Sequence, residues 1–301
     1  MNLFGTAVSY APKLTDPQVQ RLRSLLAGAG VALGAETRTG DSRFEVYTAD
    51  IGSGAAGTLS ADGTLADLRR AVAGIAPDGV DTAIVPAALR GAARKMLLMD
   101  VDSTLIQQEV IELLAGYAGK RDEVTAVTEA AMRGELDFAQ SLHARVAVLA
   151  GLPADVVDSV RAEVTLSLGA AELVAAFRAA GHVVAVVSGG FNQILGPIAA
   201  GLGLDHWIAN ELEIVDGTLT GKVVGEVIDR AAKERYLRAW AAEEGIPLEH
   251  TIAVGDGAND LDMLSAAGMG VAFNAKPAVR AAADAAVNMP YLDAVRYIAG
   301  V

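Results

Sequence analysis

The chain has 301 residues, of which 52% are hydrophobic and none is cysteine. This length allows one large or two modest domains with a substantial core, and the lack of cysteine excludes disulfides, thiolate metal sites and cysteine catalysis. No apolar run approaches the roughly 18 to 20 residues that span a bilayer. The first 13 residues lack the basic start and long apolar stretch of a signal peptide. We therefore expect a soluble, cytoplasmic protein with no membrane partner.

The formal net charge of −13 is spread unevenly. Residues 1–95 hold 10 Lys and Arg against 9 Asp and Glu, a net charge of +1, whereas residues 96–301 hold 14 against 28, a net charge of −14. The step indicates two units with different surfaces. An acidic body repels a phosphate backbone, so we expect no nucleic-acid partner. An anionic substrate would need local positive groups or a bound cation.

The first 90 residues are expected to form a small α+β unit. Its first helix is predicted to begin at Thr15 or Asp16, with Pro17 in the first turn. The elements follow in the order strand, helix, two strands joined by a turn, helix and strand, over residues 3–11, 15–30, 31–50, 64–76 and 80–87. This order is the ferredoxin-like arrangement. Residues 86–94 are interpreted as a connector.

After residue 95, strands and helices alternate. Three strand candidates are almost entirely apolar, as strands buried on both faces of a parallel sheet are; they lie at 95–101, 182–188 and 250–256. Shorter strands are expected at 206–210 and 268–273, and a hairpin near a sheet edge at 210–225. About 80 largely helical residues separate the first two strands, far more than one crossover helix requires. We infer an inserted helical subdomain that lies over the sheet.

These patterns predict an α/β fold with a doubly wound, Rossmann-like parallel sheet and an inserted helical cap, preceded by a ferredoxin-like α+β domain. We place the first domain at residues 1–92, the second at 93–301 and the cap at about 107–170.

Polar residues follow three of the buried strands at their carboxyl ends, where ligands bind in open α/β sheets. Lys233 lies near the start of the helix expected at residues 229–245. If the strands are neighbours, these groups converge on one site. The strand-end residues are Asp100 and Asp102, Ser188 with Gly189 and Gly190, and Asp256 with Asn259 and Asp260.

Crowded carboxylates repel each other unless a cation joins them, and hard oxygen ligands suit Mg²⁺. Ser188 with the backbone N–H groups of Gly189 and Gly190 can form an anion cradle. A cradle, a magnesium site, a lysine and a spare carboxylate indicate a phosphoryl-transfer centre. The chain has no Walker A sequence, which argues against a P-loop nucleotide site. A carboxylate can itself be the nucleophile, through an aspartyl-phosphate.

Four motifs in order resemble those of the haloacid dehalogenase superfamily. They are DVDSTL at 100–105, VVSGGF at 186–191, Lys233, and GDGANDLDML at 255–264. The resemblance covers roughly residues 95–295, and the sequences around the first two motifs are most similar to the phosphoserine phosphatase subfamily. It implies Mg²⁺-dependent hydrolysis of O-phospho-L-serine to serine and phosphate, the last step of serine biosynthesis.

The resemblance also implies residue roles. Asp100 attacks phosphorus, and Asp102 protonates the leaving serine oxygen and then activates water. The implied metal ligands are Asp100, Asp256 and the backbone carbonyl of Asp102. The phosphate is held by Ser188, Gly189 and Lys233, with support from Gly190, Asn259 and Asp260. In the cap, Glu109 pairs with the substrate ammonium, Arg145 with its carboxylate, and Met132 and Phe138 form the walls.

Other interpretations stay open at this point. Lys233 and Arg145 would also fit ordinary helix surfaces, and Met132 and Phe138 would fit a core. The same site could transfer phosphate to another alcohol, such as homoserine, or prefer another phosphomonoester. A phospho-accepting receiver or an amino-acid sensor with an inactive site is a non-enzymatic alternative.

Residues 1–90 resemble an ACT domain in the order of their elements. That resemblance implies a serine or other amino-acid effector, or a homodimer, as partner of this unit. However, residues 10–19 lack the D-x-P-G loop in which such a ligand often binds. The sequence leaves the role of the unit undecided.

Overall fold

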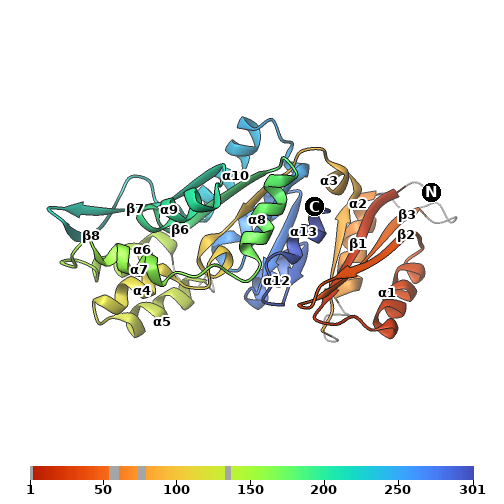
Figure 1. Ribbon diagram of the computed structural model, residues 1–301, viewed down its shortest axis with the longest axis horizontal. Coiled ribbons are helices and arrows are strands. Elements are labelled where there is room, and N and C mark those ends of the chain that lie inside the picture. Colours follow the sequence, from red (N-terminus) through yellow and green to blue (C-terminus); the bar gives the residue numbers. More distant parts are fainter. Residues whose placement is uncertain (1–2, 54–60, 74–78, 133–136) are drawn as a thin grey trace.

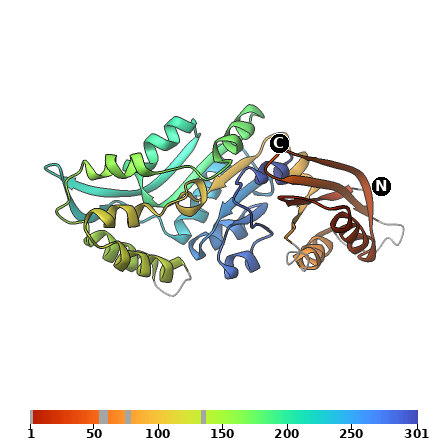
Figure 2. The same cartoon turned by 60° about the horizontal axis from the view of Figure 1, so that its bottom comes forward.

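The computed structural model describes the chain except for residues 1–2, 54–60, 74–78 and 133–136. Three parts follow one another along its long axis (Figures 1 and 2). A small sheet with two helices lies at the N-terminal end, a larger sheet flanked by helices lies in the middle, and a group of helices lies at the far end.

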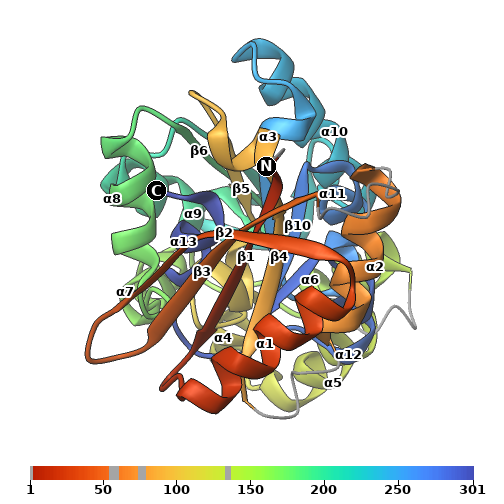
Figure 3. The ribbon, with the colours of Figure 1, turned by 90° about the vertical axis from the view of Figure 1, so that its right-hand side faces the viewer.

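The first part is a four-stranded antiparallel sheet in the order β2-β3-β1-β4 (Figure 3). The β-α-β-β-α-β order predicted from the sequence is therefore confirmed. Thr15 caps the first helix through a capping box with Gln18, and Pro17 lies in the first turn, as expected. The elements are β1 Leu3–Ala11, α1 Asp16–Gly28, β2 Val31–Gly40, β3 Glu45–Ser53, α2 Ala61–Ala73 and β4 Asp81–Pro86.

The two faces of this small sheet have different partners. Helices α1 and α2 cover one face, where Leu26 and Leu68 pack on the sheet. The other face belongs to the same core as the C-terminal segment of the chain. Phe44 stacks on Tyr291 with ring centroids 5.7 Å apart. Both faces are therefore buried, one of them by the second part of the chain.

The expected connector at residues 86–94 contains a short helix, α3 Ala87–Gly91, which the sequence did not predict. Its side chain Leu89 is buried. The boundary between residues 92 and 93 stays a prediction.

In the described part of the chain, the second sheet has seven strands in the order β11-β10-β9-β5-β6-β7-β8. All neighbouring pairs are parallel except β7 with β8, which form the predicted hairpin at the edge. The strands are β5 Met96–Met99, β6 Val183–Phe191, β7 His206–Val215, β8 Thr218–Val224, β9 Thr251–Gly255, β10 Met269–Phe273 and β11 Ala285–Val287.

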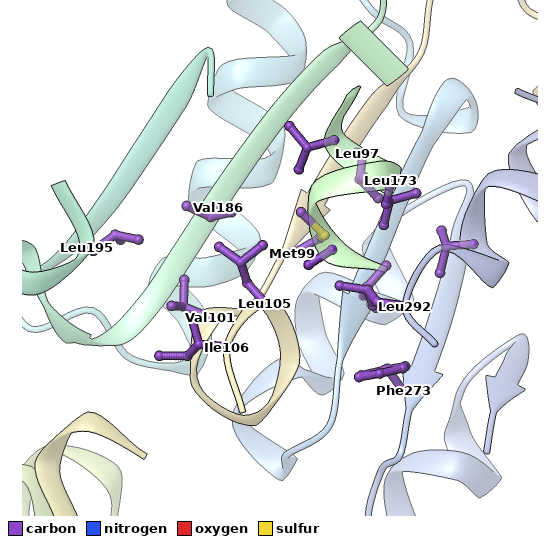
Figure 4. Packing of buried hydrophobic residues seen from close by; sticks show 14 of the residues in the cluster. Leu97, Met99, Val101, Leu105, Ile106, Leu173, Val186, Leu195, Phe273 and Leu292 are labelled. Carbon is purple, nitrogen blue, oxygen red and sulfur yellow. The ribbon is translucent and has the colours of Figure 1, made fainter. Parts of the chain in front are cut away.

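Helices cover both faces of this sheet, which confirms the doubly wound arrangement. Alternate residues of the apolar strand β5 enter different cores: Leu97 and Met99 lie on one face, Met96 and Leu98 on the other. Figure 4 shows Leu97 and Met99 beside Leu173 and Leu292. One face packs against α8 Ala170–Ala179, α9 Asn192–Leu202 and α13 Ala294–Ala299, and the other against α10 Arg230–Glu243, α11 Leu261–Ala266 and α12 Pro277–Ala282.

The predicted helical insertion lies between β5 and α8. It consists of α4 Val110–Tyr117, α5 Arg121–Met132, α6 Phe138–Ala147 and α7 Val156–Glu163. The turn after α6 is anchored to the edge hairpin, because the backbone N–H of Gly151 donates to the carbonyl of Leu219 over 2.9 Å. Among the described residues, no helix combines the length and the apolar composition that crossing a membrane requires.

Candidate active site

The central strand β5 lies between β6 and β9, so the polar ends of these three strands meet at one edge of the sheet. Asp100 follows β5 directly, Ser188 lies near the end of β6, and Asp256 follows β9. All three side chains are buried. The convergence predicted from the sequence is confirmed.

A tight turn at Val101–Leu105 follows Asp100 and contains Asp102, the second aspartate of the first motif. Within it Ser103 has φ 57°, a left-handed conformation that non-glycine residues rarely adopt. The turn points the carboxylate of Asp102 toward the second strand end. There one oxygen accepts a hydrogen bond from Ser188 Oγ over 3.1 Å, and the other accepts from the backbone N–H of Val110 over 2.9 Å. Asp100 and Asp102 therefore face different partners.

Lys233 is fully buried, which excludes the surface interpretation. Its Nζ lies 2.7 Å from Asp100 Oδ1 and 2.7 Å from Asp260 Oδ1. Asp229 caps the helix that carries this lysine, and so fixes where the side chain starts. Burial alone would lower the pKa of Lys233, but the two carboxylates outweigh it and raise that pKa. The lysine is therefore a permanent cation at the site.

Three carboxylates crowd around this lysine. Oxygens of Asp100, Asp256 and Asp260 all lie within 4.8 Å of one another, and all three residues are buried. Burial, followed by the neighbouring carboxylate of Asp260, raises the pKa of Asp100 to about 7. Burial and the carboxylates of Asp260 and Asp100 raise the pKa of Asp256 well above its ordinary value. One lysine does not neutralise three acids, so the cluster fits an additional cation.

The hydrogen bonds of Asp260 distinguish it from the other two acids. Its Oδ2 accepts from the backbone N–H groups of Asp256 and Gly257, each over 3.0 Å, and its Oδ1 faces Lys233. Both oxygens are therefore used inside the protein. This geometry fits the supporting role predicted for Asp260.

The loop after β6 is closely packed. Ser188 Oγ accepts from the backbone N–H of Gly190 over 2.8 Å. A Cβ on Gly190 would lie 2.7 Å from Asp102 Oδ2, and a Cβ on Gly189 would lie 2.7 Å from the ring of Phe138. Both positions therefore need glycine because other groups approach closely. Asn210 also holds this loop, since its side chain donates to the Gly189 carbonyl and accepts from the backbone N–H of Ile228.

A cavity of about 50 Å³ lies between the sheet edge and the cap. The cap side contributes Glu109, Arg145 and Phe138, all predicted site residues. Opposite them, the sheet side contributes further predicted residues: Asp100, Asp102, Gly189, Gly190 and Asn259. The structure thus brings a carboxylate and a guanidinium of the cap to the same cavity as the crowded acids.

The two charged cap residues differ in their surroundings. Burial, followed by the charge of Asp102, raises the pKa of Glu109 to about 8, while its Oε1 accepts from Ser103 Oγ over 2.5 Å. Arg145 is also buried, and burial lowers its pKa. No carboxylate among the described residues forms an ion pair with Arg145, which excludes an ordinary helix salt bridge within that part of the chain.

Sequence interpretation missed residues that hold the site residues in place. Thr104, part of the first motif, donates to Asp256 Oδ1 over 3.2 Å. The place of Thr104 in the motif was the only signal for it. Thr128, whose Oγ1 accepts a hydrogen bond from Arg145 Nη1 over 3.0 Å, and Asn210 carried no signal in the sequence. Met132 ends α5, and its side chain lies outside the described part of the structure, so its predicted role stays a prediction.

Comparisons with known proteins agree with this site. Residues 97–265 match the haloacid dehalogenase-like hydrolases. A protein of Streptomyces coelicolor named phosphoserine phosphatase is 62% identical over 223 residues, which make up 74% of this chain and 54% of that protein. The chain thus spans about half the length of this relative.

Solved structures are similar as well. A phosphoserine phosphatase determined as a phospho-aspartyl intermediate analogue is 44% identical, with a TM-score of 0.66, over 68% of this chain and 98% of that one. A probable phosphoserine phosphatase of Vibrio cholerae is 35% identical, with a TM-score of 0.74, over 98% of this chain and 87% of that one. The chain belongs to the haloacid dehalogenase-like hydrolase family.

Proposed function

We propose that the protein hydrolyses O-phospho-L-serine to L-serine and inorganic phosphate through an aspartyl-phosphate on Asp100. The observation that carries this proposal is the cavity in which Asp100 and Asp102 face Glu109 and Arg145 of the cap. Phosphoserine carries a phosphate, an ammonium and a carboxylate group, and the cavity offers a partner for each. The names of the similar proteins support the same substrate.

The phosphate group would lie beside Asp100. Ser188, the backbone N–H of Gly189, Asn259 and the buried Lys233 would hold its oxygens. Gly190 supports this loop, because its N–H already donates to Ser188 Oγ. Positive charge at this point stabilises the charge that develops on the transferring phosphoryl group.

The cluster of buried carboxylates fits Mg²⁺, which prefers hard oxygen ligands. Asp100, Asp256 and the backbone carbonyl of Asp102 would hold the ion, and Asp260 would support them. Thr104 orients Asp256. When bound, the cation neutralises negative charge on the phosphoryl oxygens and offsets repulsion between substrate and acids.

The reaction would need two nucleophilic displacements at phosphorus. First, a carboxylate oxygen of Asp100 forms a bond to phosphorus while the bond to the serine oxygen breaks. Asp102 donates a proton to that oxygen, and burial raises the pKa of Asp102, which keeps this proton available. Asp102 then accepts a proton from water, whose oxygen attacks phosphorus and releases phosphate and the free Asp100 carboxylate.

The cap would recognise the amino acid. Glu109 pairs with the ammonium group, Arg145 with the carboxylate, and Phe138 with Met132 walls the substrate. The cavity of about 50 Å³ is small and is lined on one side by the cap, so substrate entry would require the cap to move.

Phosphate release should be compared between L-phosphoserine, D-phosphoserine, phosphothreonine, phosphohomoserine, a sugar phosphate and a nucleotide, each with Mg²⁺ and with EDTA. With Mg²⁺ we expect a much higher rate of phosphate release from L-phosphoserine than from the other compounds. With EDTA we expect no release from any of them. An equal rate on the sugar phosphate would contradict the substrate assignment. Formation of phosphohomoserine from phosphoserine and added homoserine, with a matching fall in free phosphate, would instead indicate transfer to an alcohol.

Magnesium is expected to raise the melting temperature more at pH 8 than at pH 5.5. The raised pKa values of Asp100, about 7, and of Asp256 mean that the folded, metal-free protein binds protons more tightly than the unfolded chain. Stability from these protons is present at low pH and is lost as the pH rises through the folded pKa values. Protons therefore compete with Mg²⁺ more strongly at pH 5.5 than at pH 8. Thermal unfolding at both pH values, with and without Mg²⁺, measures the difference.

Asp256→Asn provides the control for this measurement, since it removes a proposed ligand and should abolish most of the increase. An equal increase of the melting temperature by Mg²⁺ in this variant and in the wild type would contradict the assignment of Asp256 as a metal ligand.

Gly189→Ala is expected to lower kcat/KM for phosphoserine by about 10- to 100-fold, because the new Cβ would displace the ring of Phe138 and the cap with it. Gly201→Ala is a matched control, since a Cβ there meets nothing within 4 Å. Steady-state kinetics of both variants check the prediction. Equal kinetics for the two variants would show that the close contact between Phe138 and Gly189 is not needed for activity.

Three further predictions from the sequence concern features other than this site. They are a serine or other amino-acid effector at the ACT-like unit, a homodimer and a cytoplasmic location.

A further inference from the structure

We propose that Thr128 is a positioning residue that makes the enzyme selective for substrates with a carboxylate, by fixing the guanidinium of Arg145. This inference rests on the proposed function and deepens it. Thr128 lies on α5, lines the substrate cavity and is 2% exposed.

Within the described part of the chain, two hydrogen bonds hold the guanidinium of Arg145. Its Nε donates to the carbonyl of Ser141, one turn earlier on α6, over 3.1 Å. Its Nη1 donates to Thr128 Oγ1, on the neighbouring helix, over 3.0 Å. The first bond ties the head group to its own helix, and only the second sets its direction across the cavity.

Glu109 and Asp102 act on Arg145 as neighbouring charges, without an ion pair to its guanidinium. The Arg145 side chain is buried, yet both hydrogen-bond partners are neutral oxygens, and no carboxylate of the described residues pairs with it. A guanidinium has five N–H donors, of which these bonds use two. A buried cation with spare donors favours a bidentate anion such as a carboxylate.

Threonine suits this task better than a flexible polar residue. Its branched Cβ restricts χ1 on a helix to few rotamers, so the hydroxyl has a fixed position. Arginine has four flexible side-chain torsions, and a guanidinium that is held at one edge loses less freedom when substrate binds. Without the hydroxyl, Nη1 would lose its buried acceptor, and the head group would leave the orientation that the carboxylate needs.

The test compares Thr128→Val, which replaces the hydroxyl by a methyl group, with Thr128→Ala and with Thr128→Ser, which keeps the hydroxyl. Thr125→Val on the same helix is the matched control, because Thr125 does not line the cavity. Each variant is assayed with L-phosphoserine and with O-phosphoethanolamine, which has the ammonium group but no carboxylate. Melting temperatures verify that each variant is folded.

We expect Thr128→Val and Thr128→Ala to raise KM for phosphoserine by about tenfold or more, the effect of one hydrogen bond to a charged group. We expect kcat/KM for phosphoethanolamine to stay within about twofold of the wild type. Thr128→Ser should recover most of the loss on phosphoserine, and Thr125→Val should leave both substrates unchanged. Equal losses on the two substrates would overturn the proposal, because they would indicate a merely structural role.

A double-mutant cycle separates action through Arg145 from a direct effect. In an Arg145→Ala background, Thr128→Val should cause no further loss on phosphoserine. A full additional loss in that background would overturn the proposal. If the wild type itself shows no preference for phosphoserine, the proposed function fails, whereas a selective wild type with an unaffected Thr128→Val variant overturns this inference alone.

Discussion

Replacing Asp100 by Asn is expected to lower phosphate release from phosphoserine by at least about 10⁴-fold, because an amide cannot attack phosphorus. The substitution also removes one of three crowded acids, so metal-free Asp100→Asn should be more stable than the metal-free wild type at pH 8. Burial, followed by the neighbouring carboxylate of Asp260, raises the pKa of Asp100 to about 7, so we expect its charged form to be disfavoured in the folded state at pH 8. Phosphate assays and thermal unfolding in EDTA measure the two effects.

Asp158→Asn is the matched control, since Asp158 lies exposed on α7 in an ion pair with Arg161. It should change neither quantity appreciably. Activity of Asp100→Asn within tenfold of the wild type would remove Asp100 as the nucleophile. If Asp100→Asn were less stable than the wild type in EDTA, the Asp100 carboxylate would stabilise the folded, metal-free protein, contrary to our expectation.

Lys233→Met is expected to abolish nearly all activity and to destabilise the metal-free protein by about 3 to 5 kcal/mol at pH 8. The lysine is fully buried with two carboxylates at 2.7 Å, and its removal leaves them without a cation. At pH 5.5 the destabilisation should be smaller, because Asp100, with its pKa already raised to about 7, is then protonated in the folded state. Denaturant unfolding at both pH values provides the comparison.

Lys222→Met, on the exposed edge strand β8, controls for the loss of one positive charge. It should leave stability within about 0.5 kcal/mol and activity unchanged. An equal destabilisation by both substitutions would mean that net charge, and not the local ion pairs, determines the effect.

The strands that carry the site could be predicted because a short, almost entirely apolar run followed by polar residues is typical of a central strand in a parallel sheet. Each run that is buried on both faces became a central strand of the parallel sheet, and each was followed by polar residues. The short edge strand β11 was missed, since Ala285–Val287 is too short to show a pattern. The helix α3 was missed for the same reason.

The contact between the two sheets could not be predicted from the sequence. Arg43 bonds the buried Asp293, 2.7 Å away, and Tyr10 donates to the carbonyl of Ala286 over 2.7 Å. Partners this far apart in sequence depend on how the folded parts meet, and neither residue belongs to a recognisable motif.

Some site residues could be predicted from the sequence and others could not. Asp100, Asp256 and Lys233 follow from strand ends and motif order, and the structure places them together. Thr128 and Asn210 act through another group, so their importance depends on a rotamer or a loop position that local sequence does not specify.

An acid quench of the protein during turnover of ³²P-labelled L-phosphoserine with Mg²⁺, followed by mapping of the labelled peptide, tests whether Asp100 carries the phosphate. We expect a label that is stable in acid, labile in base and located on Asp100, at no more than one per chain. Steady turnover with no protein-bound label, or with the label on another residue, would contradict this expectation.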